Sequence, residues 1–261
     1  MHIKLLKAIV LTFTILSVSS CIPDHFVASH NLSSRVSAVH ISFTKINQSA
    51  IRFDAASIVK ISASLPNAIQ LGTGFIAASF MRDRHRISFV VTNYHVIQGS
   101  AHITVISEHG TRYFARVVRT DQRQDLVLLA VRGLKGAPLC LASHPPMPGE
   151  YLATLGHPQG GPLRESTGRF RGLATVITPE GSSRAYAVLL KLQPGNSGGP
   201  LLGPTGRVLG VVFARGSGRN SNVGFAISWY SLRTFLPRLH QCQHSLKTPK
   251  VHPLAAKKKK N

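Results

Sequence analysis

Acidic residues are scarce in this sequence. Its 261 residues include 9 Asp and Glu against 31 Lys and Arg, a formal net charge of +22. Such a surface attracts polyanions, including nucleic acid, anionic lipid and cell-envelope polymers. No RNA-binding or DNA-binding motif accompanies the charge, so a specific nucleic-acid partner is not expected. A basic proteome or a secreted, surface-adsorbing protein explains the charge better, and association with an anionic membrane or envelope polymers stays open.

Metal-binding motifs are absent, and cysteines are few. Although the chain has 13 His, it contains no H-E-x-x-H motif and no paired Cys/His spacing, so no metal site is predicted. The cysteines are Cys21, Cys140 and Cys242. An odd number in an exported chain leaves one unpaired if the other two form a disulfide. Nothing in the spacing shows whether Cys140 and Cys242 meet.

Long apolar runs are also missing. The run from Ala8 to Val18 follows two lysines and precedes small residues, and it is too short to span a membrane comfortably. Residues 1–21 are therefore predicted to be a secretory signal peptide. The end of this segment, VSSC, also resembles the bacterial lipobox, in which the Cys is lipidated. The protein is expected to be exported: secreted, or periplasmic and membrane-anchored through Cys21.

Helical periodicity is nearly absent, whereas short β-branched runs recur from Ile58 onward, each ended by Gly, Pro, Asn or Asp. Closely spaced short strands of this kind predict an all-β barrel or sandwich. The predicted strand segments are SIVKISA, GTGFIAASF, ISFVVTNYHVI, HITVISEHG, YFARVVR, LVLLAVR, YLATLG, GLATVITP, YAVLLKL, RVLGVVFAR and VGFAIS.

The two ends of the chain differ from this strand-rich part. Residues 22–52 are predicted to be a linker with an early strand, and residues 53–241 to be the folded domain. In SWYSLRTFLPRLHQC the apolar residues recur at spacings of three and four, which predicts a C-terminal helix kinked at Pro237. The basic residues 242–261 are expected to be a disordered tail.

The stretch QPGNSGGPLL contains Ser197, either a nucleophile or only part of a turn. A hydroxyl nucleophile needs a base and a third group that orients the base. His95 directly follows an apolar strand, where an imidazole can act as a general base. Most other histidines have polar surroundings, as His85 and His109 do, and are expected at the surface.

The scarcity of carboxylates narrows the choice of the orienting acid. Asp121 and Asp125 both precede the apolar run LVLLAV. Asp125 adjoins this run directly and can be held rigidly at the edge of the core, whereas Asp121 is expected to be solvated. Asp125 can alternatively be a simple turn residue at the start of a strand.

Several motifs occur together in one order: GTGFIAA, TNYHVIQG, DLVLLAV, LGHPQG, STGRFRG, QPGNSGGPLL, GRVLGVVFA and NVGFAIS. With its motifs in this order, the chain resembles the trypsin-like serine proteases of the HtrA (DegP) type over roughly residues 58–239. The resemblance implies two six-stranded antiparallel β-barrels with the active site between them.

The resemblance also implies residue roles. Ser197 would be the nucleophile, His95 the general base and then acid, and Asp125 the carboxylate that orients the imidazole. The backbone N–H groups of Gly195 and Ser197 would form the oxyanion hole. The implied activity is that of an exported serine endopeptidase, which cleaves proteins or peptides through an acyl-enzyme and needs no cofactor.

Substrate binding is implied at Phe213, Ala214 and Arg215, a strand that resembles the edge on which an extended peptide pairs. The sequence departs from the family in three ways: no PDZ module follows, a longer N-terminal loop is absent or replaced by DRHR, and Lys191 stands where the base of the primary specificity pocket is expected. Without the PDZ module, trimeric assembly is in doubt and the oligomeric state is left open.

Lys191 has two interpretations. It can make the pocket cationic and select an acidic side chain before the scissile bond, or the alternation along AVLLKL can turn it to solvent, which is the favoured interpretation. A different function for the whole chain is also considered, a catalytically silent, basic envelope-binding protein that keeps the protease fold. The +22 charge is the feature that this alternative explains best.

Overall fold

The computed structural model describes residues 51, 53–178 and 181–236. The predicted signal peptide, the linker up to residue 50, Cys21, Cys242 and the tail lie outside the described residues. Cys140 is disulfide-bonded. No helix within the described ranges is long and apolar enough to cross a membrane.

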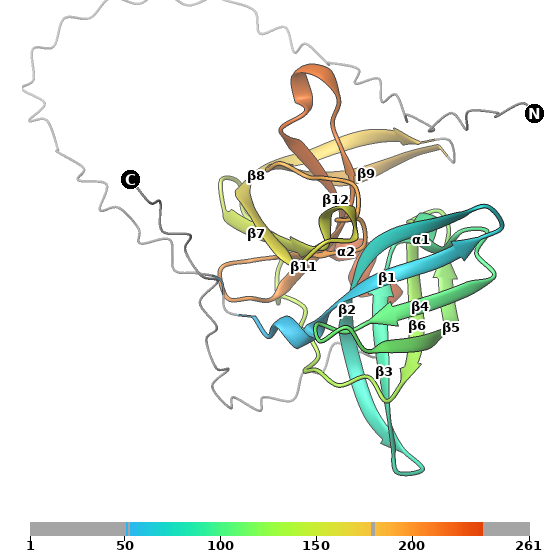
Figure 1. Cartoon of the computed structure of the whole chain (residues 1–261). Helices are drawn as coiled ribbons and strands as arrows, with labels where there is room; N and C mark the ends of the chain where they lie inside the picture. The colour runs from blue at the N-terminus through green and yellow to red at the C-terminus, as the bar shows by residue number, and fades with distance from the viewer. Residues whose placement is uncertain (1–50, 52, 179–180, 237–261) are drawn as a thin grey trace, which may run out of the picture.

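Two closed antiparallel β-barrels form the described part of the chain (Figure 1). In the first barrel the strands are ordered β1-β2-β3-β6-β5-β4, and in the second β10-β11-β12-β9-β8-β7. The first barrel contains β1 (Ile58–Leu65), β2 (Ala68–Arg82), β3 (His85–Thr92), β4 (His102–Ile106), β5 (Arg112–Asp121) and β6 (Leu126–Arg132). The second contains β7 (Tyr151–Gly156), β8 (Arg164–Thr178), β9 (Gly181–Leu189), β10 (Pro200–Leu202), β11 (Val208–Arg215) and β12 (Val223–Ser228). The predicted fold is confirmed.

Short helical turns connect the strands. They are η1 (Ala55–Ser57), α1 (Tyr94–Ile97), η2 (Pro158–Gly160) and η3 (Gly218–Asn220). The last described helix, α2 (Trp229–Phe235), begins where the side chain of Ser228 accepts a hydrogen bond from the Ser231 N–H. It covers the first half of the predicted C-terminal helix, and the segment from Pro237 onward lies outside the described residues.

The sequence did not predict strand β10. It has only three residues, all of them buried, so it shows no alternation of apolar and polar side chains. It nevertheless closes the second barrel, since it pairs with β7 on one side and with β11 on the other. Because β10 begins directly after the loop that carries Ser197, this short strand ties that loop to the barrel.

Three groups of apolar side chains form the main cores. One fills the first barrel, with Ile61 and Val105 among its buried residues, and another fills the second barrel, with Leu152 and Leu201. The third lies between the barrels, because it joins Ile58 and Phe75 of the first to residues of β7, β10 and β11. Burial of this third group holds the two barrels against each other.

Helix α2 contributes to the core between the barrels through Leu232 and Phe235. The Phe235 ring is 2% exposed, and the Arg119 guanidinium of β5 lies over it, 5.0 Å from its centroid. Arg119 Nη1 also donates a hydrogen bond of 2.8 Å to the Phe235 carbonyl. One helical turn is thus held by both the apolar core and the first barrel.

Replacing Phe235 with Ala should therefore lower the free energy of unfolding by about 3 to 5 kcal/mol, since it removes a buried ring and leaves a cavity. Thr234→Ala, one residue earlier on the exposed side of the same helix, should change it by less than about 0.5 kcal/mol. Urea denaturation under non-reducing conditions measures both. Equal effects of the two substitutions would contradict the assigned core.

Candidate active site

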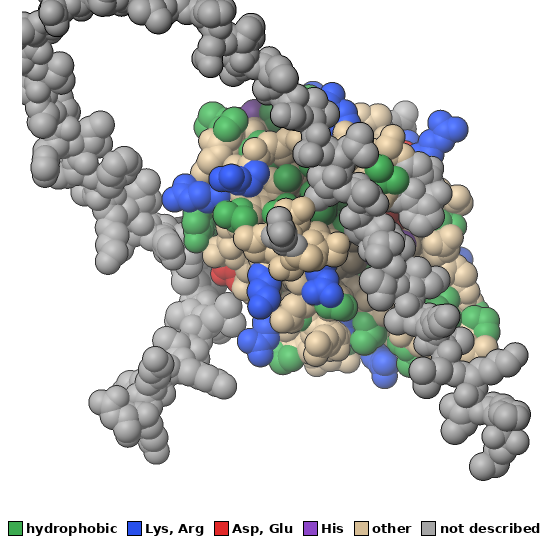
Figure 2. Space-filling model, turned by 90° about the horizontal axis from the view of Figure 1, so that it is seen from above, with side chains coloured by type: hydrophobic (Ala, Val, Ile, Leu, Met, Phe, Trp, Pro, Cys, Tyr) green, Lys and Arg blue, Asp and Glu red, His purple; other side chains and the backbone are tan. Residues whose placement is uncertain are grey.

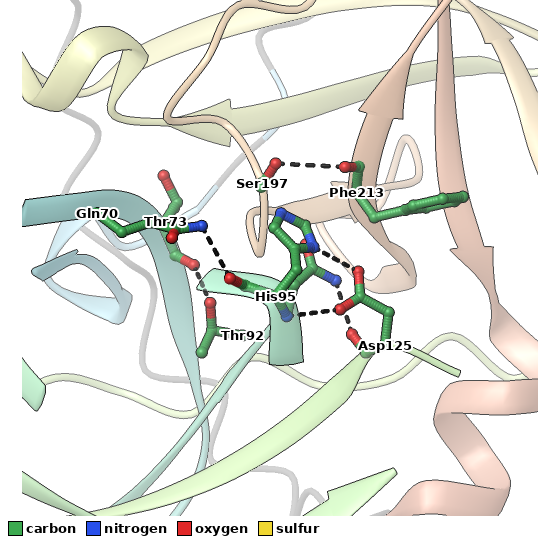
Figure 3. Close-up of polar contacts among 8 residues, drawn as sticks. Gln70, Thr73, Thr92, His95, Asp125, Ser197 and Phe213 are labelled. Atoms are coloured by element: carbon green, nitrogen blue, oxygen red, sulfur yellow. Dashed lines mark hydrogen bonds and ion pairs between the residues drawn. The ribbon is translucent and has the colours of Figure 1, made fainter. Parts of the chain in front are cut away.

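His95 and Asp125 meet at one end of the first barrel (Figure 3). His95 lies in the single turn α1, directly after β3, and Asp125 lies directly before β6. The His95 Nδ1 atom is 2.6 Å from Asp125 Oδ2, and the His95 backbone N–H donates to Asp125 Oδ1 at 2.8 Å. Because a carboxylate only accepts, Nδ1 carries the proton and the neutral ring keeps a lone pair on Nε2.

The backbone around Asp125 is fixed by further contacts. Its carbonyl accepts hydrogen bonds from Tyr94 N at 3.2 Å and from Asn93 Nδ2 at 2.9 Å. Its φ of 53° lies in the left-handed region, which Asp tolerates better than most residues. The carboxylate of the neighbouring Asp121 instead accepts a hydrogen bond from the Gln124 N–H within the turn. The structure thus brings Asp125, and not Asp121, to His95.

Ser197 comes from the second barrel, in the loop of residues 193–199 between β9 and β10, called the nucleophile loop below. Its Oγ donates a hydrogen bond of 3.3 Å to the Phe213 carbonyl, and none of the hydrogen bonds among described residues joins Ser197 to His95. A Cβ at Gly72 would lie 2.6 Å from Val96 Cγ1 and 3.2 Å from Ser197 O, so α1 and the nucleophile loop pack against the same residue. Figure 3 places Ser197 beside the imidazole of His95.

The nucleophile loop leaves two backbone donors without partners. The Pro194 carbonyl accepts a hydrogen bond of 2.7 Å from Gln159 N in η2. In a trans peptide the N–H is opposite to the C=O, so the Gly195 N–H points away from η2. Asn196 N instead donates to Gln193 O at 3.1 Å. Among the described residues, neither Gly195 N nor Ser197 N has an acceptor, an arrangement suited to binding an oxyanion.

Glycine is required at position 195. Its φ of 94° is rarely adopted by residues that carry a Cβ. A Cβ there would also collide with the His157 carbonyl and lie 2.8 Å from Gln159 N. Both the conformation and the space therefore favour glycine.

The predicted substrate-binding strand lies at an irregularity in β11. In the pairing of β11 with β12, Val212 is opposite Ala226 and Ala214 is opposite Phe225, so Phe213 forms a bulge. The Phe213 carbonyl is therefore available to Ser197 Oγ. Arg215, at the end of the strand, is exposed.

Lys191 is exposed to solvent, and its neighbours Leu190 and Leu192 are buried, 4% and 3% exposed. The two leucines lie over Gly224, where an added Cβ would be 2.9 Å from Leu190 Cδ1 and 2.7 Å from Leu192 Cδ1. The side chain of Lys191 thus lies on the outside, with apolar side chains on either side in the sequence.

Sequence reasoning did not find two buried residues next to the nucleophile loop, Thr73 and His157. Both occur in motifs of the resemblance, GTGFIAA and LGHPQG, but without contacts a small polar residue in such a motif looks like part of a turn. His85 and His109 are exposed, as expected, whereas His157 is only 7% exposed. His157 Nδ1 donates to Gly161 O at 3.0 Å, and Nε2 is buried with no partner among the described residues.

The family model of the trypsin-like peptidase domain matches residues 72–211. The chain belongs to the trypsin-like peptidases. It resembles the serine protease Rv3671c of Mycobacterium tuberculosis, with 35% identity over 64% of this chain and 42% of that protein. It also resembles the chloroplastic protease Do-like 1 of Arabidopsis thaliana, with 30% identity over 73% of this chain and 42% of that protein.

A solved structure agrees with this family assignment. The crystal structure of the active form of the Rv3671c protease from Mycobacterium tuberculosis has a TM-score of 0.62 and 31% identity, covering 72% of this chain and 83% of that chain. The chain spans less than half the length of the two curated relatives described above.

The buried His157 predicts a pH dependence of stability. Burial lowers the pKa of His157 below its ordinary value of 6.5, the Lys60 charge adds to this, and the hydrogen bond to Gly161 opposes it. As the pH falls below 6.5, the unfolded chain therefore takes up the proton before the folded chain does. The stabilisation is complete above pH 6.5 and is lost as the pH falls through the folded pKa.

Wild-type protein should therefore lose stability relative to His157→Asn between pH 7.5 and pH 5, by about 1.4 kcal/mol for each unit by which burial lowers the pKa. Asn is chosen because its amide can still donate toward Gly161. Denaturation curves at a series of pH values measure the difference. Parallel curves for the two proteins would contradict the buried, neutral state of His157.

Proposed function

We propose that the chain is an exported serine endopeptidase in which Ser197, His95 and Asp125 form the catalytic triad. The observation that carries this proposal is the 2.6 Å contact between His95 Nδ1 and Asp125 Oδ2 next to Ser197 (Figure 3). The loop of this serine leaves two N–H groups without acceptors among the described residues. A nucleophile, a base, an acid that orients the base and an oxyanion site are the parts that acyl transfer needs.

The first half of the reaction follows from this arrangement. Ser197 Oγ turns from the Phe213 carbonyl toward His95 Nε2 and attacks the carbonyl carbon of the scissile bond, while its proton moves to Nε2. Asp125 stabilises the imidazolium that forms. The oxygen that becomes negative accepts hydrogen bonds from Gly195 N and Ser197 N, donors of a kind that contribute on the order of 3 kcal/mol each to transition-state stabilisation.

The second half releases the products. The proton on Nε2 passes to the leaving amine, the C–N bond breaks, and the acyl group stays on Ser197 Oγ. Water then attacks this ester with His95 again as the base, which yields a carboxylic acid and the free serine. No step requires a metal or a cofactor.

An extended peptide is the proposed substrate. Beyond the bulge at Phe213, Ala214 and Arg215 pair with β12 on one side, whereas β10 pairs with β11 only as far as Val211. A substrate strand can therefore pair with their other side through main-chain hydrogen bonds. Pairing of this kind requires an unfolded or flexible segment of the protein to be cut. Unfolded proteins or flexible loops are therefore the proposed substrate class.

Export of the protein is proposed from the N-terminal sequence, where lysines precede a short apolar run. Among the relatives, one of Chlamydia trachomatis is described as a probable periplasmic serine endoprotease, with 30% identity over 60% of this chain. Lipidation of Cys21 would anchor the protein to a membrane, and cleavage without lipidation would release it.

A secondary property is proposed from the charge. On the face seen in Figure 2, Lys and Arg side chains lie at several separate places and acidic side chains are scarce. Scattered basic side chains favour loose adsorption to anionic lipid or envelope polymers over a defined groove. This charge also favours the second candidate function, a silent envelope-binding protein, which the next experiment separates from the peptidase.

A fluorophosphonate probe should label the wild-type protein at Ser197, and Ser197→Ala should abolish both labelling and casein cleavage. Asp125→Asn should lower kcat by about 10³-fold to 10⁴-fold, because the imidazole loses the partner that sets its tautomer. Asp121→Asn is the matched control, since Asp121 does not contact His95, and its kcat should stay within about twofold. No labelling, with Ser197→Ala equal to wild type, would favour the silent binding protein.

We further propose that Lys191 does not select acidic residues, since its side chain lies in solvent between two buried leucines. Cleavage of a peptide library should show no enrichment of Asp or Glu before the cut, and Lys191→Ala should leave the residue preference unchanged. Mass spectrometry of the products measures both preferences. An enrichment of Asp or Glu that Lys191→Ala removes would instead support the interpretation that Lys191 makes the pocket cationic.

A further inference from the structure

Thr73 of β2 is fully buried and contacts the nucleophile loop from the opposite barrel. Its backbone N–H donates a hydrogen bond of 2.8 Å to the Ser197 carbonyl. Its hydroxyl donates a second one, of 2.7 Å, to the Gly195 carbonyl in the same loop. One residue of the first barrel therefore holds the two carbonyls on either side of Asn196.

The same hydroxyl has a second partner. It accepts a hydrogen bond of 2.9 Å from the His157 backbone N–H, which directly precedes η2. A hydroxyl has one proton to donate, and here the proton is directed to the Gly195 carbonyl, while a lone pair receives the His157 N–H. The Thr73 side chain thus links β2 to two separate loops of the second barrel.

These two loops together position the oxyanion site. Gln159 N of η2 holds the Pro194 carbonyl, and Thr73 Oγ1 holds the Gly195 carbonyl, so the peptides on both sides of the Gly195 Cα are fixed. Gln159 itself has a φ of 53°, a left-handed conformation that is uncommon for a residue with a side chain. The contact from His157 to Thr73 anchors η2 next to this residue.

We propose that Thr73 is a positioning residue for the oxyanion hole: its hydroxyl holds the Gly195 carbonyl and η2 so that the N–H groups of Gly195 and Ser197 face the substrate. This inference rests on the proposed peptidase activity. Thr73 does not touch the reacting atoms and acts through the backbone of the nucleophile loop.

A hydroxyl is needed for this role because of burial. Val has nearly the shape of Thr, but Thr73→Val would leave the Gly195 carbonyl and the His157 N–H without partners. Thr73 is 0% exposed, so water cannot easily replace the missing group. Two backbone groups without partners favour a rearranged loop, in which the oxyanion donors no longer point at the substrate.

The test compares steady-state kinetics of a peptide ester or amide in wild type, Thr73→Val and Thr73→Ser. Thr73→Val should lower kcat about 10-fold to 100-fold and change KM by less than about threefold, since donors that act in the transition state are displaced. The affinity for a peptide boronate, which binds as a tetrahedral adduct, should fall in parallel. Thr73→Ser keeps the hydroxyl and should remain within about threefold of wild type.

Ser88→Ala is the matched control. Ser88 is also fully buried in the first barrel, and its hydroxyl donates to the Leu134 carbonyl at 2.9 Å, away from the nucleophile loop. It should lose stability but keep kcat. If Thr73→Val does not fold, Thr73→Cys replaces it, because a thiol of similar size donates more weakly and its kcat should fall below that of Thr73→Ser.

The outcomes separate this inference from the proposed function. An active wild type whose Thr73→Val or Thr73→Cys variant keeps kcat within twofold overturns the role of Thr73 alone. The same holds if Ser88→Ala loses as much kcat as Thr73→Val, or if Thr73→Ser fails to restore it. A wild type that neither cleaves nor reacts with fluorophosphonate overturns the proposed function, and this inference with it.

Discussion

The packing of the two barrels against each other is the constraint on which the candidate site depends. His95 and Asp125 come from the first barrel, and Ser197 and the proposed oxyanion donors come from the second. The separation of these groups therefore depends on how the two barrels pack. The apolar core between the barrels brings the surfaces together, and the hydrogen bonds of Thr73 then set the nucleophile loop relative to β2. Burial of apolar side chains brings the barrels together without fixing an exact geometry, and the directional hydrogen bonds of Thr73 then fix the position of the loop.

The two halves of the site are built differently. The His95–Asp125 pair lies within one barrel, where α1 follows β3 and Asp125 precedes β6, and β3 and β6 are paired strands. The strand pairing alone therefore places the two residues near each other. The end of the nucleophile loop is held by β11, because Gly198 and Gly199 exchange backbone hydrogen bonds with Val212. The part before Ser197 depends on hydrogen bonds of its backbone to η2 and to the first barrel.

Much of the fold could be predicted from the sequence because alternating apolar residues and turn residues mark most strands. The exception, β10, is buried on both faces and too short to show a period. The family motifs pointed to His95, Asp125 and Ser197, and the structure brings them to one place. Asp125 could be preferred over Asp121 because it adjoins a buried strand.

The roles of Thr73 and His157 could not be predicted, because they depend on contacts between distant parts of the chain. Thr73 and Gly195 are separated by 122 residues, and Thr73 and His157 by 84, so no local pattern reveals their hydrogen bonds. The burial of His157 was equally hidden, since its neighbours in LGHPQG are turn residues. For Lys191, alternation between Leu190 and Leu192 indicated the exposed side, and only the three-dimensional structure shows both leucines over Gly224.

The central claim is that Ser197 and His95 act on one substrate carbonyl. A peptidyl chloromethyl ketone tests this directly, because the serine adds to the ketone while the imidazole displaces the chloride. Mass spectrometry of the treated protein should show one inhibitor bound per chain, less one HCl, and peptide mapping should place it on His95. Ser197→Ala should prevent the reaction. Modification scattered over other histidines, or equal modification of Ser197→Ala, would contradict the account.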